Sequence, residues 1–385
     1  MVSPAARIAF NLSLFYGAIF ASVGIFLPYW PVWLESRGLS VVEIGLIIGA
    51  SYWPRIITSL VVPNLADRFR RRRFLMTLSA GLTLILLMIF SLVSDFWLFM
   101  LLGLLMGATW SCILPLADAI SLERTAALGL DYGRVRLWGS ITFILMSIFG
   151  GIALEQTGVS SIFILLVLTT GLTLIACLFM PEEPHAATSS EPASLRRLFR
   201  RTDLWVLVIA SSLIQASHTL LYNFGSIHWR SGGLSETVIG WLWAEGVIAE
   251  VLFFLVSAKL IVRLSLGRLL VIAGALAVVR WMLIGHFSSL PLLIFTQALH
   301  AASFALTFLA TIHYIRETTP PELQASAQGF YVAVGFAPLS GMVSLISGWL
   351  YNTLGGEAFF MMALMAAAGT MLAFALPSVT KEASR

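Results

Sequence analysis

Twelve apolar runs, each long enough to cross a lipid bilayer as a helix, dominate this sequence of 385 residues. About twenty apolar residues in a helix span the hydrocarbon core of a membrane. Hydrophobic residues make up 59% of the chain and charged residues only 11%, against about 25% charged residues in soluble domains. The runs are continuous, whereas the strands of membrane barrels alternate polar and apolar residues. The sequence therefore predicts an all-α integral membrane protein with twelve transmembrane helices.

The predicted spans form two sets of six around one polar stretch. We predict a six-helix bundle over residues 1–181, a cytoplasmic linker over 182–203, and a second six-helix bundle with a short tail over 204–385. Six spans, a linker and six spans are typical of a duplicated transporter whose site lies where its halves meet. The spans cover residues 8–34, 41–64, 74–95, 97–121, 136–156, 160–180, 204–228, 236–262, 267–287, 290–315, 323–350 and 355–377.

Lysine and arginine are concentrated in the loops on one side of these spans. The loop after the second span carries Arg68 and four arginines at 70–73, and the linker carries four more. Loops on the other side carry only Arg37 and Arg230. Because positively charged loops stay in the cytoplasm, we predict a multi-pass protein of the cytoplasmic (inner) membrane with both termini in the cytoplasm. The same pattern accounts for the net charge of +4 without a nucleic-acid partner.

Five ionisable residues lie deep inside the predicted spans: Arg55, Asp118, Glu245, Glu250 and Arg280. A charge near the middle of a bilayer costs about 2.5 to 3.5 kcal/mol, and such residues face watery cavities, pair with each other and mark solute or ion pathways. The alternative for each residue is a structural ion pair that fixes helix packing. Both halves contribute to the set, which favours a shared pathway.

Helical spacing adds polar side chains to this predicted cavity. His218 and Tyr222 share one face of the seventh span, and His300 begins a polar face on the tenth. Hydrogen bonding between helices explains the accompanying serines and threonines, but it explains the two histidines poorly. Glu245 and Glu250 lie about 140° apart around their helix, so both cannot face one point. We predict that Glu250 faces the cavity and leave the role of Glu245 open.

Motifs for chemistry are missing from the sequence. No glycine loop for phosphate binding appears, and no nucleophile stands in an arrangement with a base. Cys112 and Cys177 lie inside apolar spans without the spacing of metal ligands. We therefore predict that the protein is not an enzyme and uses neither a cofactor nor a metal.

Two motifs in the first half carry a family resemblance. Pro-Leu-Ala-Asp ending at Asp118, followed by Gly-Arg-Val-Arg-Leu-Trp-Gly around Arg136, resembles the sugar:proton symporters of the major facilitator superfamily, typified by lactose permease. The resemblance implies that Asp118 and Arg136 bind substrate. Arg280 and His300 are spaced like that family's essential arginine and histidine. Ser303 stands where those symporters carry the glutamate that holds the coupling proton, so their proton mechanism does not transfer.

A closer resemblance is to the phenylpropionic acid permease family. It is carried by Leu-Asp-Tyr-Gly and Val-Arg-Leu-Trp-Gly-Ser over residues 130–140, by Val-Val-Arg-Trp around Arg280, and by Arg55, and it covers both halves. It implies proton-coupled symport of a small organic solute, with an aromatic carboxylate such as phenylpropionate as the best candidate. The substrate-binding set is then Arg55, Asp118, Arg136, His218, Tyr222, Glu250, Arg280 and His300.

The sequence leaves alternatives open for the substrate and the coupling residue. Glu250 leads as the proton carrier because a carboxyl in a low-dielectric cavity can load and release a proton near neutral pH, with Asp118 and His300 as the alternatives. The substrate could instead be a sugar or a nucleoside. From another class, the chain could be a sensor that binds solute without moving it. The expected partners are the small-molecule substrate, protons and the lipid bilayer, and the expected state is a monomer.

Overall fold

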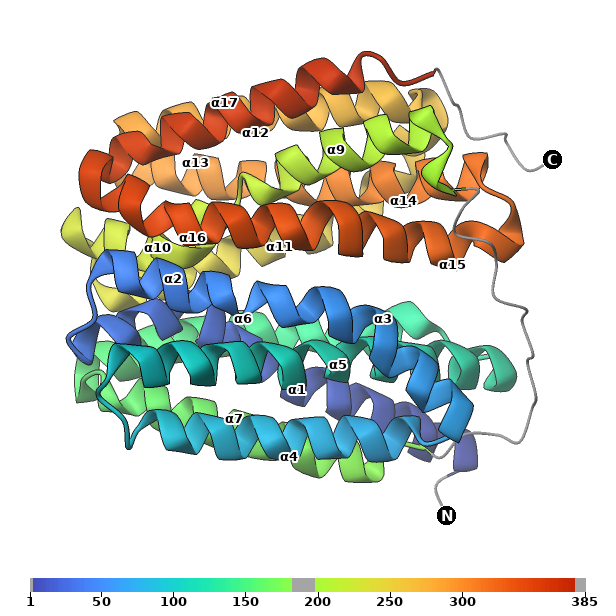
Figure 1. Ribbon diagram of the computed structural model, residues 1–385, viewed down its shortest axis with the longest axis horizontal. Helices are drawn as coiled ribbons and strands as arrows, with labels where there is room; N and C mark the ends of the chain where they lie inside the picture. Colours follow the sequence, from blue (N-terminus) through green and yellow to red (C-terminus); the bar gives the residue numbers. More distant parts are fainter. Residues whose placement is uncertain (1–2, 182–197, 378–385) are drawn as a thin grey trace. The chain divides into compact units, whose positions relative to one another are not determined.

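The computed structural model describes residues 3–181 and 198–377, and helices make up its ordered elements (Figure 1). Eleven helical segments of the described chain are long and apolar enough to cross a membrane. The last of them, Ser326–Ala373, has 48 residues and would measure about 72 Å as one helix, against a hydrocarbon core of about 30 Å. A 3-10 turn at Gly355–Glu357 interrupts it, so it corresponds to the last two predicted spans. The predicted all-α membrane fold is confirmed.

The described chain divides into two compact units. The first unit contains Met1–Ala186 and Trp229–Ala244, and the second contains Ala187–His228 and Glu245–Arg385. Most of the predicted linker, residues 182–197, lies outside the described residues, so the proposed domain limits stay predictions.

One predicted span of the first unit is two helices. The second span breaks at Ser51, whose hydroxyl donates to the carbonyl of Ile48 at 2.6 Å. Gly107 of the neighbouring helix lies so close to the backbone of Ser51 that a Cβ atom would collide with it. In chain order the helices of this unit are α1 (Pro4–Ser36), α2 (Val41–Ala50), α3 (Tyr52–Phe69), α4 (Arg72–Phe90), α5 (Phe96–Leu128), α6 (Tyr132–Thr157) and α7 (Ser160–Phe179).

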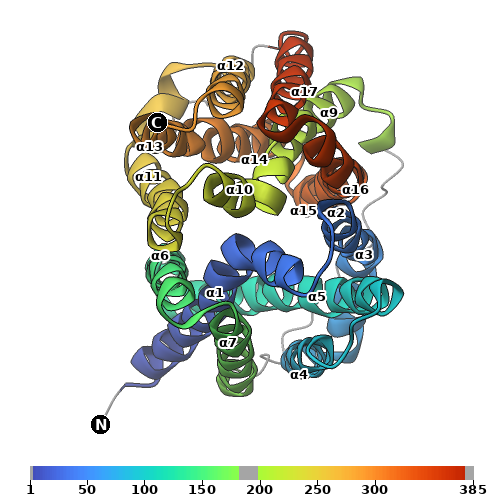
Figure 2. The same ribbon diagram turned by 90° about the vertical axis from the view of Figure 1, so that its left-hand side faces the viewer.

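Small residues bring the helices of the first unit together. Helix α1 packs against α6 and α7 (Figure 2). The hydroxyl of Ser147 on α6 donates to the carbonyl of Gly24 on α1 at 3.2 Å. A Cβ atom at Gly24 would lie 2.7 Å from the carbonyl oxygen of Phe143. Membrane helices gain no hydrophobic advantage by leaving lipid, so this close contact between backbones supplies the packing.

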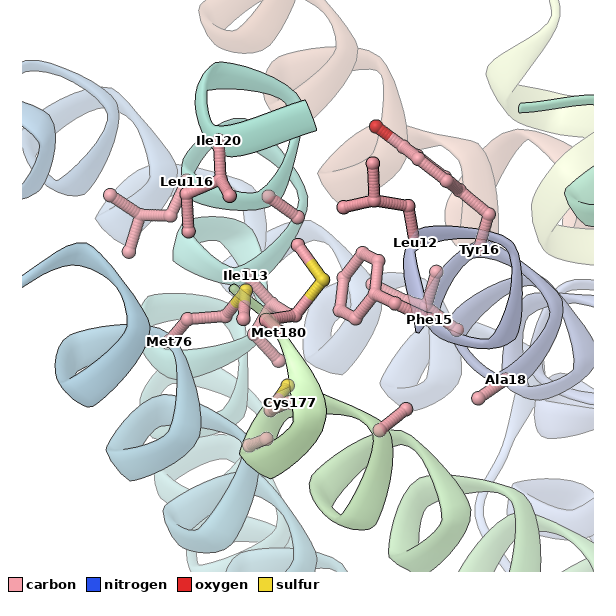
Figure 3. Packing of buried hydrophobic residues seen from close by; sticks show 14 of the residues in the cluster. Leu12, Phe15, Tyr16, Ala18, Met76, Ile113, Leu116, Ile120, Cys177 and Met180 are labelled. Carbon is pink, nitrogen blue, oxygen red and sulfur yellow. The ribbon is translucent and has the colours of Figure 1, made fainter. Parts of the chain in front are cut away.

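A buried apolar cluster joins α1, α4, α5 and α7 (Figure 3). Each helix contributes side chains that are at most 5% exposed, among them Phe15, Met76, Cys112 and Cys177. Tyr16 also belongs to the cluster, and its hydroxyl points away from the apolar side chains. The cluster therefore fixes the ring of Tyr16 and leaves its polar end at the border.

The helices of the second unit show interruptions at polar positions. The seventh predicted span breaks between Ala216 and Thr219, and a π-helical turn, η1 (Ala301–Ala305), follows His300 directly. Such turns often mark functional sites. The remaining elements are α9 (Thr202–Ala216), α10 (Thr219–Ser231), α11 (Glu236–Arg263), α12 (Leu266–His286), α13 (Leu290–His300), α14 (Leu306–Thr318), α15 (Pro321–Phe330), η2 (Tyr331–Phe336), α16 (Ala337–Leu354), η3 (Gly355–Glu357) and α17 (Ala358–Ala373).

The turn between α10 and α11 packs with the first unit, through residues 229–244. Arg230 forms ion pairs with Glu35 of α1, at 3.2 Å, and with Glu236. The carboxylate of Glu155 on α6 accepts a hydrogen bond from the backbone of the second residue of α11 at 2.9 Å, where the helix dipole favours negative charge. These four side chains line a cleft of about 520 Å³.

Candidate substrate-binding site

The predicted site residues fall into two groups, one in each unit. Arg55, Asp118 and Arg136 belong to the first unit, and the other five belong to the second. Within each unit the structure shows which side chains are accessible and which are held by neighbours.

Arg280 is the centre of the group in the second unit. Its guanidinium donates to Nδ1 of His300 at 2.9 Å and to Oε1 of Gln297 at 3.0 Å, and it lies over the ring of Trp281 at 4.7 Å. The residue is 0% exposed. A solute cannot touch this guanidinium in the observed conformation. Arg280 therefore acts by holding His300 and Gln297 in position.

The partners of His300 determine its tautomer. An arginine only donates hydrogen bonds, so Nδ1 accepts from Arg280 and carries no hydrogen. A neutral ring then carries its hydrogen on Nε2, which lies 2.8 Å from Oε1 of Glu250. His300 therefore links the buried Arg280 to the carboxylate of Glu250 on α11.

His218 is also held in one tautomer. Its Nδ1 lies 3.1 Å from the carbonyl oxygen of Ile214 and 3.2 Å from that of Gln215, so this nitrogen carries the hydrogen. Its Nε2 accepts from the hydroxyl of Ser303 at 3.1 Å. The residue is 0% exposed, at the break between α9 and α10. His218 is thus inaccessible to a solute in the observed conformation.

Tyr222 and Glu250 are the accessible predicted residues of the second unit. Both are half-buried, and the side chain of Glu250 is 19% exposed. The ring of Tyr222 lies 6.3 Å from that of His300 and 6.4 Å from that of Phe304, which stacks on His300 at 5.0 Å. This arrangement places an acid beside an aromatic wall.

Glu245 differs from Glu250. It is half-buried on the same helix, and no hydrogen bond or ion pair of its carboxylate occurs among residues 3–181 and 198–377. Of these two glutamates, Glu250 is the one that contacts His300.

In the first unit, two tyrosines hold Asp118. Its Oδ1 accepts from the hydroxyl of Tyr16 at 2.5 Å and from that of Tyr132 at 3.1 Å. Asp118 and Arg136, both in the described chain, form no ion pair, although α6 begins early enough, at Tyr132, to bring the arginine near. The two phenols satisfy the carboxylate instead.

Arg136 is half-buried and lies flat against an aromatic ring. Its Cζ atom is 3.9 Å from the ring centre of Phe20 and 5.4 Å from that of Tyr16, which is the geometry of a cation–π contact. Gly139 makes room for it, since a Cβ atom there would lie 2.7 Å from Nη1 of Arg136. In the part of the chain that the structure describes, this guanidinium has neither a hydrogen bond nor an ion pair.

Arg55 resembles Arg136 in its surroundings. It is half-buried on α3, and its Cζ atom lies 4.9 Å from the ring centre of Tyr52. Its Nε is buried without a hydrogen-bond partner among the described residues. The first unit thus contains two half-buried guanidinium groups on aromatic rings, neither of which forms an ion pair in the described chain.

Comparison with known proteins decides the family. The model of the family described as "MFS_1 like family" matches residues 9–362. This chain belongs to that family. Its members are transporters of the major facilitator superfamily, so the MFS_1-like protein is a multi-pass membrane transporter with a small-molecule substrate and is not an enzyme.

Relatives and solved structures agree with this membership. An Escherichia coli (strain K12) protein named "Probable 3-phenylpropionic acid transporter" is 34% identical over 361 residues, covering 92% of this chain and 94% of that protein. Maltose permease of Geobacillus stearothermophilus is 27% identical, covering 88% of this chain and 86% of that protein. The crystal structure of the nucleoside transporter NupG has a TM-score of 0.82 at 17% identity, covering 96% of this chain and 98% of that chain. The resemblance to phenylpropionic acid permeases is thus confirmed, and the structural likeness establishes the fold.

Residues that the sequence patterns did not single out also organise the candidate site of this MFS_1-like transporter. Tyr16 and Phe20 are four residues apart on α1, the spacing of one helix face, and this was the available signal. Gln297 precedes His300 by three residues on α13 and shares its face in the same way. None of these three residues is charged, so none of them stands out within an apolar run.

Proposed function

We propose that this MFS_1-like protein is a proton-coupled symporter that takes up a small aromatic carboxylate resembling 3-phenylpropionate. The observation that carries the proposal is Arg136. A half-buried guanidinium that forms no ion pair with a described residue attracts a carboxylate strongly, because the low dielectric around it weakens screening. The ring of Phe20 beside it offers a surface for an aromatic group. The name of the relative with 34% identity supports the same substrate class.

The proposed roles follow from accessibility. In the first unit, Arg136, with Arg55, binds the carboxylate of the substrate, and the ring of Phe20 contacts its aromatic group. In the second unit, Tyr222 and Glu250 are the accessible residues. The buried side chains of Arg280, His218 and His300 support the accessible residues of the second unit from inside the protein. Asp118 shapes the pocket in the first unit.

Glu250 is the proposed proton carrier. His300 already uses Nδ1 as an acceptor for Arg280, so protonating that nitrogen would break this bond. Asp118 already accepts from two phenols. Glu250 remains partly exposed and contacts His300, so it can take up a proton and release it. The transporter is proposed to work as a monomer in the cytoplasmic membrane with both termini in the cytoplasm.

Uptake into proteoliposomes tests the proposal. Purified protein is reconstituted, and radiolabelled 3-phenylpropionate is supplied with an inward proton gradient or with a protonophore. Accumulation that requires the gradient is the expected result. Counterflow without accumulation would show transport without proton coupling, and binding without counterflow would identify a sensor.

The same liposomes separate the substrate classes. Unlabelled aromatic carboxylates should compete with the label, whereas maltose, lactose and uridine should not. Transport of a sugar or a nucleoside in place of 3-phenylpropionate would overturn the proposal.

A further inference from the structure

We infer that Tyr16 determines the preference for an anionic substrate by keeping Asp118 away from Arg136. This inference rests on the proposed function, because it concerns how the carboxylate site stays available. Tyr16 acts as a positioning residue, since its own contact is with Asp118.

Tyr16 contacts both charged groups. Its hydroxyl donates to Oδ1 of Asp118 at 2.5 Å, while its ring centre lies 5.4 Å from Cζ of Arg136. Tyr132 donates to the same oxygen at 3.1 Å, and the two phenol oxygens are 3.4 Å apart. Asp118 and Arg136 lie within range of each other's electrostatic field. The hydrogen bonds from the two phenols compete with their direct pairing.

Direct pairing is the strong alternative for these two groups. A guanidinium and a carboxylate form two parallel hydrogen bonds, which are about twice as strong as neutral ones. A paired Arg136 would have its charge neutralised and its donors occupied. The site would then offer hydroxyl partners in place of a free positive charge. Holding Asp118 with phenols preserves the charge that a substrate carboxylate needs.

The ring of Tyr16 is suited to this task because it is fixed. It is 0% exposed within the apolar cluster, and it packs edge-on against Phe15 at 5.6 Å (Figure 3). Its hydroxyl therefore cannot follow a moving carboxylate. Asp118 must come to the phenol, which holds the acid in one place.

Equilibrium binding to the purified full-length protein tests the inference. The Kd of 3-phenylpropionate is measured by titration calorimetry for the wild type, Tyr16→Phe, Asp118→Asn and the double variant. Tyr16→Phe keeps the ring and removes the hydrogen bond, so Asp118 can pair with Arg136. We expect a Kd raised by about 10-fold, the worth of a hydrogen bond to a charged group. In the double variant the neutral amide no longer competes, and the Kd should return to within about 3-fold of the wild type.

Tyr29→Phe is the matched control. Tyr29 lies on the same helix, is also 0% exposed, and donates to the backbone of Ser147 at 2.6 Å. Its loss removes a buried hydroxyl without freeing a carboxylate, so the Kd should stay unchanged. The uncharged amide of 3-phenylpropionate is titrated in parallel, and its Kd should change less than that of the acid in Tyr16→Phe.

These outcomes distinguish failure of the role inferred for Tyr16 from failure of the proposed function. A wild-type Kd in Tyr16→Phe, or a loss that Asp118→Asn does not restore, overturns the role of Tyr16 and leaves the proposed function standing. A wild type that binds no aromatic carboxylate overturns both. Melting temperatures of all variants show that a weakened Kd comes from folded protein.

Discussion

Glu250 and His300 are joined by a contact of 2.8 Å between a carboxylate oxygen and Nε2 of the imidazole. The other ring nitrogen accepts from Arg280, so the hydrogen of the neutral ring must lie on Nε2 and point at the acid. The chain of groups runs from a fully buried cation to a partly exposed anion. This relationship makes Glu250 the member of the pair that is open to protons.

Glu250→Gln should abolish accumulation of 3-phenylpropionate while exchange continues. Glutamine keeps the shape and an acceptor for Nε2 of His300, but it cannot carry a proton. Proteoliposomes with an inward proton gradient report accumulation, and counterflow reports exchange. Glu245→Gln is the control, because it removes another half-buried acid of α11 that has no partner in the described chain. Gradient-driven accumulation by Glu250→Gln would contradict the role.

Arg136→Ala should lower kcat/KM for uptake by about 10- to 100-fold, since a hydrogen bond to a charged group is worth about 1.5 to 3 kcal/mol. The melting temperature should stay close to that of the wild type, because the guanidinium has no described polar partner to leave behind. Uptake kinetics and differential scanning fluorimetry are measured on the same preparation. Full uptake activity would remove Arg136 from the site.

Arg280→Ala should abolish transport and also destabilise the protein. The change leaves His300 and Gln297 without their buried donor, and breaking a buried polar network by removing one partner costs about 3 to 5 kcal/mol. The melting temperature should therefore fall clearly below that of Arg136→Ala. Equal melting temperatures for the two alanine variants would show that Arg280 is not the structural centre described above.

Gly240→Ala should destabilise the packing of α11 on the first unit. A Cβ atom there would lie 2.7 Å from the hydroxyl of Tyr29 and would also press on the backbone of Ser147, which has no freedom to move away. Gly246→Ala is the matched change on the same helix, where the nearest atom, on His300, would be 3.5 Å away.

The two glycine variants should shift the melting temperature in opposite directions. Gly246→Ala gains helix propensity of up to about 1 kcal/mol and should keep or raise the melting temperature. Gly240→Ala should lower it through the steric conflict. Equal melting temperatures for the two variants would contradict the steric conflict expected at Gly240.

Much of this protein can be derived from local sequence patterns. A run of about twenty apolar residues must form a helix in a bilayer, because every backbone polar group needs a partner within the segment. Membrane insertion, the all-α fold and the spans follow from that one requirement. Buried charges such as Arg55 and Glu250 are equally visible, since each stands out against its apolar neighbours. The motif around Arg136 indicated the family resemblance.

The pairing of those charges depended on the tertiary structure. Asp118 could have met Arg136, and only the packing of α1 against α5 and α6 presents the hydroxyls of Tyr16 and Tyr132 to it. The complete burial of Arg280 likewise depends on how its neighbours are rotated. A hydrogen bond needs its partners within about 3 Å at the right angle, and residues far apart in the chain reach that distance only through helix packing. The sequence by itself determined which groups are available, and the tertiary structure decided which of them are occupied and which are free.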